Sequence, residues 1–218
     1  MALPTQKFGT LVRRGPVNRH YDRMKRTFDL FIAFAAIVAI LPLLITIAML
    51  IRASGPGPIL YKQRRLGRGG REFWCLKFRT MVANADEVLR SNPKLFQEFQ
   101  ANFKIKDDPR ITPIGRFLRR TSLDELPQFF NVMAGDMSLI GPRPIVQNEL
   151  EKYGPYADRL LSVLPGLGGV WQTSGRSEVD YSERVAMDMF YIENRSFYLD
   201  FKLLLLTALA VLKRDGAC

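Results

Sequence analysis

The sequence is poor in the residues that most often carry catalytic or redox chemistry. Of its 218 residues, one is a histidine (His20) and two are cysteines (Cys75 and Cys218). A lone histidine argues against a Ser-His-Asp triad or a histidine-based metal centre. Two cysteines without paired spacing argue against a disulfide framework or a cysteine zinc site. If the chain is an enzyme, its chemistry must depend on carboxylates, lysine, arginine or a bound metal ion.

Acidic residues are scarce in the N-terminal third of the chain. Residues 1–81 hold 15 basic and 3 acidic side chains, whereas residues 82–218 hold 17 and 18. The net charge of +11 therefore originates in the N-terminal third. A basic patch is typical of nucleic-acid binders, but here the basic residues bracket an apolar run, where anionic lipid headgroups attract them. We therefore expect anionic membrane lipids as partners, and no nucleic acid.

The apolar run from Leu30 to Ile51 is 22 residues long and carries no formal charge. As one helix it would measure ~33 Å, enough to cross the hydrocarbon core of a bilayer. Pro42 lies near its middle and favours a kink. Each flank of twenty residues holds six basic side chains, so the positive-inside rule gives the run no orientation. These features favour a re-entrant helix, broken at Pro42, over a spanning helix or a buried helix of a soluble protein.

The remaining sequence predicts a mainly helical α+β fold. A β-hairpin is expected over 58–81, a helix divided by Pro93 over 83–104, and amphipathic interfacial helices near 114–120 and 203–212. Three segments follow from these patterns. They are a basic N-terminal segment (1–27), the re-entrant membrane helix (28–52) and a domain on the cytosolic face that would hold any catalytic site (53–218).

The acidic pair Asp124–Glu125 is the strongest candidate for catalytic carboxylates. Ser122 and Glu125 have the spacing of a capping box, and Pro127 suits a first turn, so a helix is expected to begin between Ser122 and Asp124. A helix N-terminus favours the ionised form of both carboxyl groups, and an ionised aspartate can attack phosphorus. With Asp136, the pair could hold Mg²⁺. The alternative is that both residues are ordinary helix caps.

Basic and amide side chains in constrained motifs form a candidate substrate-binding set. Arginine offers a planar fork and lysine a point charge for phosphate. Gln172 and Arg176, after a glycine-rich loop, are candidate contacts to a nucleotide or sugar. The alternative for each member is a solvated surface residue. The candidate phosphate ligands are Lys77, Arg79, Arg119 and Arg143.

At these motifs the sequence resembles the bacterial sugar transferases, which are monotopic polyprenyl-phosphate phosphoglycosyl transferases. The most specific match is the run Ser-Leu-Asp-Glu-Leu-Pro-Gln over 122–128, followed by Asn131 and by Gly-Pro-Arg-Pro over 141–144. Lys25, Arg26 and Asp29 are similar to the family's opening. The tail from Asp188, through Tyr191 and Asp200, to Ala217 looks like the branch that makes exopolysaccharide and O-antigen lipid precursors. Longer members of the family carry several N-terminal spanning helices, and many have Ser where this chain has Leu41.

The resemblance implies a ping-pong transfer at the cytoplasmic face of the bacterial inner membrane. Asp124 would attack the β-phosphorus of a UDP-sugar, release UMP and hold the sugar phosphate until polyprenyl phosphate displaces it. Glu125 would coordinate Mg²⁺ or activate the acceptor, while Lys77, Arg119 and Arg143 match the family's phosphate and nucleotide positions. Galactose and glucose are the sugars we expect, and a homodimer is compatible with the resemblance.

Two other functions remain open from the residues alone. One is a non-enzymatic membrane anchor or scaffold, which predicts no catalytic role for Asp124. The other is a basic nucleic-acid binder with a buried apolar helix, which predicts full solubility without detergent.

Overall fold

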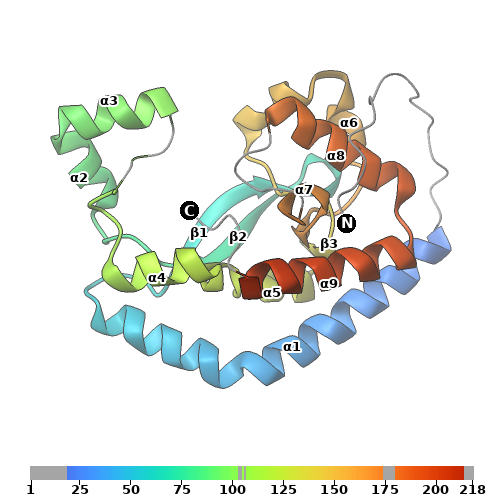
Figure 1. The fold of residues 1–218 in the computed structure, drawn as a ribbon, viewed down its shortest axis with the longest axis horizontal. Coiled ribbons are helices and arrows are strands. Elements are labelled where there is room, and N and C mark those ends of the chain that lie inside the picture. Colours follow the sequence, from blue (N-terminus) through green and yellow to red (C-terminus); the bar gives the residue numbers. More distant parts are fainter. Residues whose placement is uncertain (1–18, 103–104, 106, 174–179, 214–218) are drawn as a thin grey trace.

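The computed structural model describes residues 19–102, 105, 107–173 and 180–213. This part of the chain is mainly helical with two small two-stranded sheets, in agreement with the α+β prediction. Figure 1 shows one long bent helix, α1, beneath a domain formed by the other elements. In chain order, the elements are α1 (Arg19–Ala53), β1 (Leu60–Leu66), η1 (Arg68–Gly70), β2 (Glu72–Phe78), α2 (Ala85–Ser91), α3 (Pro93–Asn102), α4 (Pro113–Thr121), η2 (Leu123–Glu125), α5 (Gln128–Ala134), β3 (Ser138–Ile140), η3 (Gln147–Tyr156), α6 (Ala157–Leu160), β4 (Gly166–Gly168), α7 (Val170–Thr173), α8 (Tyr181–Asn194) and α9 (Phe197–Lys213).

The predicted β-hairpin and the helix divided by a proline are both confirmed. Strands β1 and β2 pair antiparallel, from Leu60 opposite Phe78 to Leu66 opposite Glu72. Alternate residues of β2 face opposite sides, so Phe73 and Cys75 are buried in the main core while Trp74 is 49% exposed. Pro93 begins α3 directly after α2 ends, as its missing N–H group and fixed φ allow at a first helical position.

A second sheet joins two glycine-containing loops at the centre of the domain. Strands β3 and β4 are parallel, with Ser138 opposite Gly166 and Ile140 opposite Gly168. The backbone of Gly141 lies so close to Gly166 that any Cβ at position 166 would collide with it. Glycine is therefore required there to bring the 141–144 and 165–169 loops together.

The N-terminal half of α1 is tied to the domain by a buried ionic network. The ammonium group of Lys25 lies 3.5 Å from Asp29 and 3.2 Å from Asp200, and both carboxylates are almost fully buried. Tyr21 and Tyr191 donate hydrogen bonds to the two oxygens of Asp200, and Ser138 donates to Asp29 at 2.7 Å. The network thereby connects α1, β3, α8 and α9.

The C-terminal end of α1 is held by a second set of contacts to the same domain. Arg79, which follows β2, is buried and donates hydrogen bonds to the backbone carbonyls of Ile51, Gly55 and Pro56. These bonds satisfy carbonyl groups at and just beyond the end of the helix. In the same region Leu44, Ile47 and Ile51 pack in a core cluster with Phe78 and Leu118.

Between these two attachments α1 is bent and exposed. The structure has one continuous helix through Pro42 instead of two helices separated by a break, and Figure 1 shows its middle bowed away from the domain. Pro42 supplies no N–H group to the helical ladder, which accounts for a bend without loss of the helix. Only 17% of the most apolar 18-residue window is buried, which argues against a core helix of a soluble protein. The exposed apolar residues include Phe31, Phe34, Val38, Leu41, Leu43, Ile45, Met49 and Leu50.

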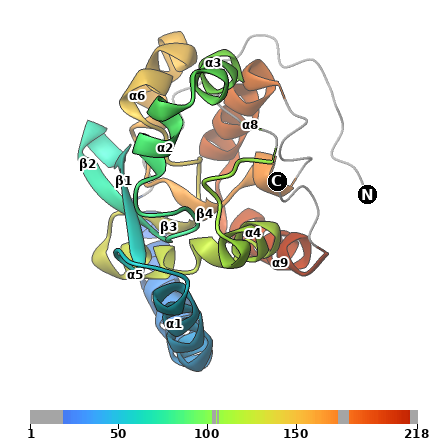
Figure 2. The ribbon, with the colours of Figure 1, turned by 90° about the vertical axis from the view of Figure 1, so that its left-hand side faces the viewer.

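The two predicted amphipathic segments are helices. Figure 2 shows α4 and α9 at about the same level above α1, and Figure 1 shows that they lie over opposite halves of this helix. Helix α4 exposes Phe117, and α9 exposes Tyr198, Phe201, Leu205 and Leu209. Both helices thus carry exposed apolar side chains, as interfacial helices require.

Replacing Lys25 should destabilise the fold severely. Lys25→Met would leave the carboxylates of Asp29 and Asp200 buried without their shared cation, and loss of one partner from a buried ion pair costs about 3–5 kcal/mol. The measurement is thermal or denaturant unfolding in detergent. The control is Arg64→Met, which removes an exposed ion pair with Glu72 whose side chains are 66% and 47% exposed. Equal, small losses for both variants would contradict the role assigned to Lys25.

Candidate functional site

The Asp124–Glu125 pair lies on the short 3₁₀ turn η2, between α4 and α5, and not in the first turn of an α-helix. The expected capping box is absent from this turn. Ser122 has a left-handed backbone (φ 56°) and ends α4, with its N–H group bonded to the Arg119 and Leu118 carbonyls. Its side chain makes no capping bond to η2. The interpretation as ordinary helix caps fails for the same reason, because α5 starts only at Gln128.

Lys77 pairs directly with Glu125. The Lys77 ammonium group, on β2, lies 2.6 Å from a Glu125 carboxylate oxygen. Both side chains are partly exposed, so the pair is open to solvent on one side. This contact brings together two residues that are 48 positions apart and that the sequence assigned separately to the site.

Asn131 fixes the position of β2 relative to η2. Its side chain accepts a hydrogen bond from the Leu76 N–H group at 2.9 Å and donates one to the Trp74 carbonyl at 2.7 Å. Asn131 is buried on α5, the helix that begins shortly after Glu125. It thus attaches α5 to the edge of β2 and keeps Lys77 opposite Glu125. Sequence reasoning listed Asn131 within a motif but did not give it this role.

Arg119 lies at the C-terminal end of α4 and contributes a second positive charge. Its Nε donates to the Thr80 hydroxyl at 2.9 Å. Thr80 also anchors α4, since its carbonyl accepts from the Thr112 N–H group and its backbone lies where a Cβ at Gly115 would be. Thr80 is a site residue that sequence reasoning missed. The available signal was its place in the sequence, directly after the candidate phosphate ligands Lys77 and Arg79.

Burial raises the pKa of Asp124 to about 6. The positive charge of Lys77 opposes this shift, the negative charge of Glu125 adds to it, and that of Arg119 opposes it again. The sequence predicts that a helix N-terminus lowers the pKa of Asp124 and favours its ionised form, but in the structure this pKa is raised. Desolvation is the larger effect because Asp124 lies in a partly buried turn without the terminal N–H groups of a longer helix. At neutral pH the carboxylate is still mostly ionised.

Arg143 lies in the loop after β3. Its backbone N–H group bonds to the buried Asp188, and its guanidinium stacks over Trp171 at 5.4 Å. Burial raises the pKa of the Cys75 thiol, and the charges of Lys77 and Arg143 both oppose this shift, so both cations lie within electrostatic range of this residue of β2. Gln172 follows Trp171 on α7, so Arg143 and Gln172 occupy one region.

One predicted site residue belongs elsewhere, and another lies outside the described residues. The Arg79 guanidinium donates hydrogen bonds to three carbonyls at the end of α1, so it is not the phosphate ligand that the sequence predicts. The reason is that Arg79 directly follows β2 and its buried guanidinium lies 2.6–3.1 Å from these carbonyls. Arg176 lies outside the described residues.

The predicted three-carboxylate metal site is not formed in the described part of the chain. Those residues contain no group of three Asp, Glu, His or Cys side chains suited to a metal ion. Asp136 follows the C-terminal cap of α5, whereas Asp124 and Glu125 precede that helix. Asp124 and Glu125 alone fit Mg²⁺, because this ion commonly takes one or two carboxylates and completes its shell with substrate phosphates and water.

Comparison with known proteins agrees with this geometry. Residues 20–214 match the family described as bacterial sugar transferase. The undecaprenyl-phosphate galactose phosphotransferase of Salmonella typhimurium is 48% identical over 198 residues, covering 89% of this chain and 41% of that protein. The exopolysaccharide production protein ExoY of Sinorhizobium fredii is 45% identical over 88% of this chain and 87% of its own.

A third relative is named for glucose. The UDP-glucose:undecaprenyl-phosphate glucose-1-phosphate transferase of Xanthomonas campestris is 38% identical over 94% of this chain and 43% of its own. The chain spans about two fifths of the length of several relatives. It spans most of the length of relatives of the short exopolysaccharide type, such as ExoY. The match to the family model covers nearly the whole described chain. The chain belongs to the bacterial sugar transferase family, of the short exopolysaccharide type.

Proposed function

We propose that this chain transfers a hexose 1-phosphate from a UDP-sugar to polyprenyl phosphate and releases UMP. The observation that carries the proposal is the half-buried Asp124–Glu125 pair, flanked by Lys77 and Arg119 and placed above a long exposed apolar helix. A nucleophile, phosphate-binding cations and a membrane element are thus adjacent. One relative is named as a galactose phosphotransferase and another as a glucose-1-phosphate transferase, which supports galactose or glucose as the sugar that is transferred.

The proposed reaction consists of two displacements at one phosphorus. A carboxylate oxygen of Asp124 bonds to the β-phosphorus of the UDP-sugar, and the bond from that phosphorus to the bridging oxygen breaks, so that UMP leaves with the electron pair. An oxygen of polyprenyl phosphate then bonds to the same phosphorus. The bond to Asp124 breaks and the carboxylate is restored. Because the acceptor phosphate is already anionic, it needs little activation by a base.

Lys77 and Arg119 supply the positive charge that this chemistry needs. Their charges already favour the ionised form of Asp124, which is the nucleophilic form. Preorganised cations also stabilise the charge that develops on the transferring phosphoryl group. Glu125 holds Lys77 in place. Mg²⁺, when bound through Asp124 or Glu125 and the diphosphate, would add further neutralisation of the phosphate charge.

We propose that α1 is re-entrant and that the domain lies on the cytoplasmic face of the inner membrane. Both ends of α1 are attached to one domain, through Lys25 near its start and through Arg79 at its end. A spanning helix would place these ends on opposite sides of the bilayer, where one polar domain could not reach both. The bend near Pro42 and the exposed apolar middle support a helix that enters and leaves on one side.

The rival functions have less support. A scaffold has no need for an aspartate whose pKa is raised to about 6 beside two cations. A soluble nucleic-acid binder has no use for the exposed apolar face of α1.

Asp124→Asn should abolish transfer while the protein folds normally. The loss of turnover should be at least about 10³-fold, because the nucleophilic charge is removed. Stability at pH 7.5 should not fall, since burial already disfavours the charged carboxylate in the folded state. UMP release and thermal unfolding measure the two effects. Asp86→Asn, an exposed acid on α2, serves as the control and should remain active.

A covalent adduct should accumulate on the wild type when lipid is omitted. With labelled UDP-galactose or UDP-glucose, about one equivalent of phosphosugar should map to the peptide that contains Asp124. Sequential kinetics with no adduct in an active preparation would contradict the nucleophile assignment.

The rate of adduct formation should depend on pH with a midpoint near the pKa of Asp124, about 6. The rate should fall about tenfold per unit of pH below that value, because only the carboxylate attacks. Lys77→Met should move the midpoint upward, since it removes a charge that lowers the pKa of Asp124. Glu125→Gln should move it downward for the opposite reason. Rapid-quench measurement at several pH values tests both directions, and an unchanged midpoint in both variants would argue against Asp124 as the titrating group.

Both ends of α1 should be reached only from the cytoplasm. One cysteine introduced at His20 or at Pro58, in a Cys218→Ser background that keeps only the buried Cys75, should react with an impermeant maleimide only after cells are lysed, and the background alone is the control. Pro58 is chosen over the neighbouring Gly57, because a side chain at position 57 would collide with the Arg79 guanidinium. Pro42→Ala should straighten the helix and increase labelling of position 20 from outside. Labelling of either site in intact wild-type-background cells would instead indicate a spanning helix.

A further inference from the structure

A cavity of about 470 Å³ lies beside the N-terminal half of α1, away from the Asp124 turn. It is lined by α1, by the hairpin tip at Arg68, and by residues around β3 and before β4. Gly135, which follows α5, lines it, whereas Glu125 precedes α5. The seven-residue helix between them is ~10 Å long, so the cavity and the nucleophile are separate places.

Most of the charged groups around this cavity have partners. Arg195 pairs with Asp22 at 2.9 Å, and Lys25 pairs with Asp29. Arg26 donates to the carbonyls of Val132 and Met133 at the end of α5. These contacts use both of the acidic residues that line the cavity.

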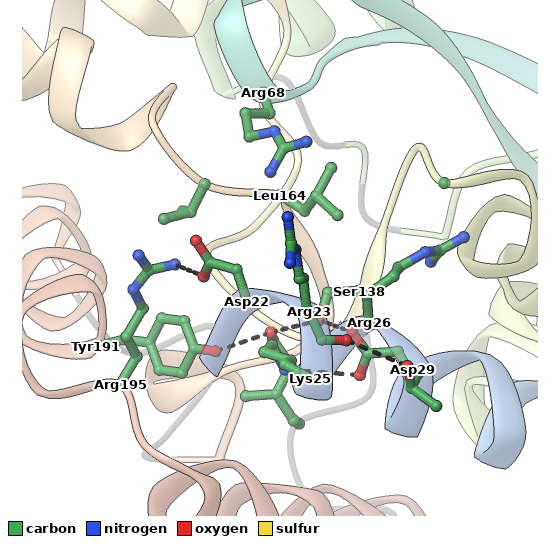
Figure 3. Close-up of a pocket in the computed structure, with 14 residues that line it drawn as sticks. Asp22, Arg23, Lys25, Arg26, Asp29, Arg68, Ser138, Leu164, Tyr191 and Arg195 are labelled. Carbon is green, nitrogen blue, oxygen red and sulfur yellow. Dashed lines mark hydrogen bonds and ion pairs between the residues drawn. The ribbon is translucent and has the colours of Figure 1, made fainter. Parts of the chain in front are cut away.

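Two arginines remain without a carboxylate. Arg23 and Arg68 both line the cavity, and 45 positions separate them in sequence. Within the described part of the chain neither of them forms an ion pair. Figure 3 shows their guanidinium groups directed into the same space beside Leu164. Two like charges directed together repel each other, and an anion between them would remove that repulsion. The planar fork of arginine suits the oxygens of a phosphate.

The position of the cavity indicates where such an anion would come from. Asp29 lines the cavity, and Phe31, two residues later on α1, is 70% exposed. The cavity therefore lies where α1 changes from polar to apolar, which is the headgroup level if α1 enters the bilayer. Ile140, Val163 and Leu164 add an apolar wall beside the arginines.

We propose that this cavity binds the phosphodiester of an anionic phospholipid between Arg23 and Arg68. The proposal rests on the membrane placement of α1 described above. A headgroup held there would fasten the N-terminal end of the re-entrant helix to the membrane surface, at a site distinct from that of the polyprenyl substrate.

The test measures the thermal midpoint of the full chain in detergent as short-chain phosphatidylglycerol is added. A ligand that binds only the folded state raises this midpoint. The wild type should show a rise that equal phosphatidylcholine or inorganic phosphate does not give. Arg23→Ala/Arg68→Ala should weaken the apparent affinity for phosphatidylglycerol at least about tenfold, because two charge-assisted contacts are lost. Arg90→Ala/Lys94→Ala, which removes two positive charges from α2 and α3, should behave as the wild type.

A separate measurement tests the membrane placement. Wild type and the Arg23/Arg68 variant should both sediment with neutral phosphatidylcholine vesicles, because the apolar face of α1 is unchanged. If neither protein sediments, the membrane placement is wrong and the headgroup site falls with it. If both sediment but the variant retains the phosphatidylglycerol response, the headgroup site alone is overturned. The same holds if inorganic phosphate reproduces the whole rise.

Discussion

The position of the membrane helix depends on one buried lysine. Lys25 lies between Asp29 on its own helix and Asp200 on α9, while two tyrosines donate hydrogen bonds to Asp200 and a serine donates one to Asp29. Burying three charged groups is costly unless each has partners, so the network forms only when α1, β3, α8 and α9 are assembled together. It therefore couples the placement of α1 to the completion of the domain. Arg79 performs a similar task at the other end of the helix with carbonyl groups as acceptors.

Because α1 is attached to the domain at both ends, its bend determines which part of the helix can enter the membrane. A helix held at both ends by one domain can enter an apolar phase only with its middle, and the middle contains Pro42 and the most exposed apolar side chains. Helices α4 and α9, which both carry exposed apolar side chains, lie at the level just above it. The proposed site on η2 directly follows α4, so a soluble nucleotide sugar and a membrane-bound acceptor could meet there.

The electrostatics of η2 reflect a balance between burial and charge. Burial raises the pKa of Asp124, while the charges of Lys77 and Arg119 lower it toward the range of an ordinary ionised carboxylate. The resulting value of about 6 leaves a carboxylate that is ionised at neutral pH yet poorly solvated. Poor solvation favours attack on phosphorus, and it also costs folding stability. Such a cost is common at functional sites.

The sequence by itself determined the hairpin, the proline-divided helix and the amphipathic segments, because these depend on local periodicity and on where glycine and proline are allowed. Its motifs also led to the family. Only the tertiary structure decided that Ser122 ends one helix instead of starting the next, that Arg79 serves α1, and that burial raises the pKa of Asp124. It also brought the Lys25–Asp29 motif to the Tyr191–Asp200 tail, about 170 residues away. These outcomes depend on which distant groups pack around a residue, and desolvation and ion pairing arise only after that packing exists.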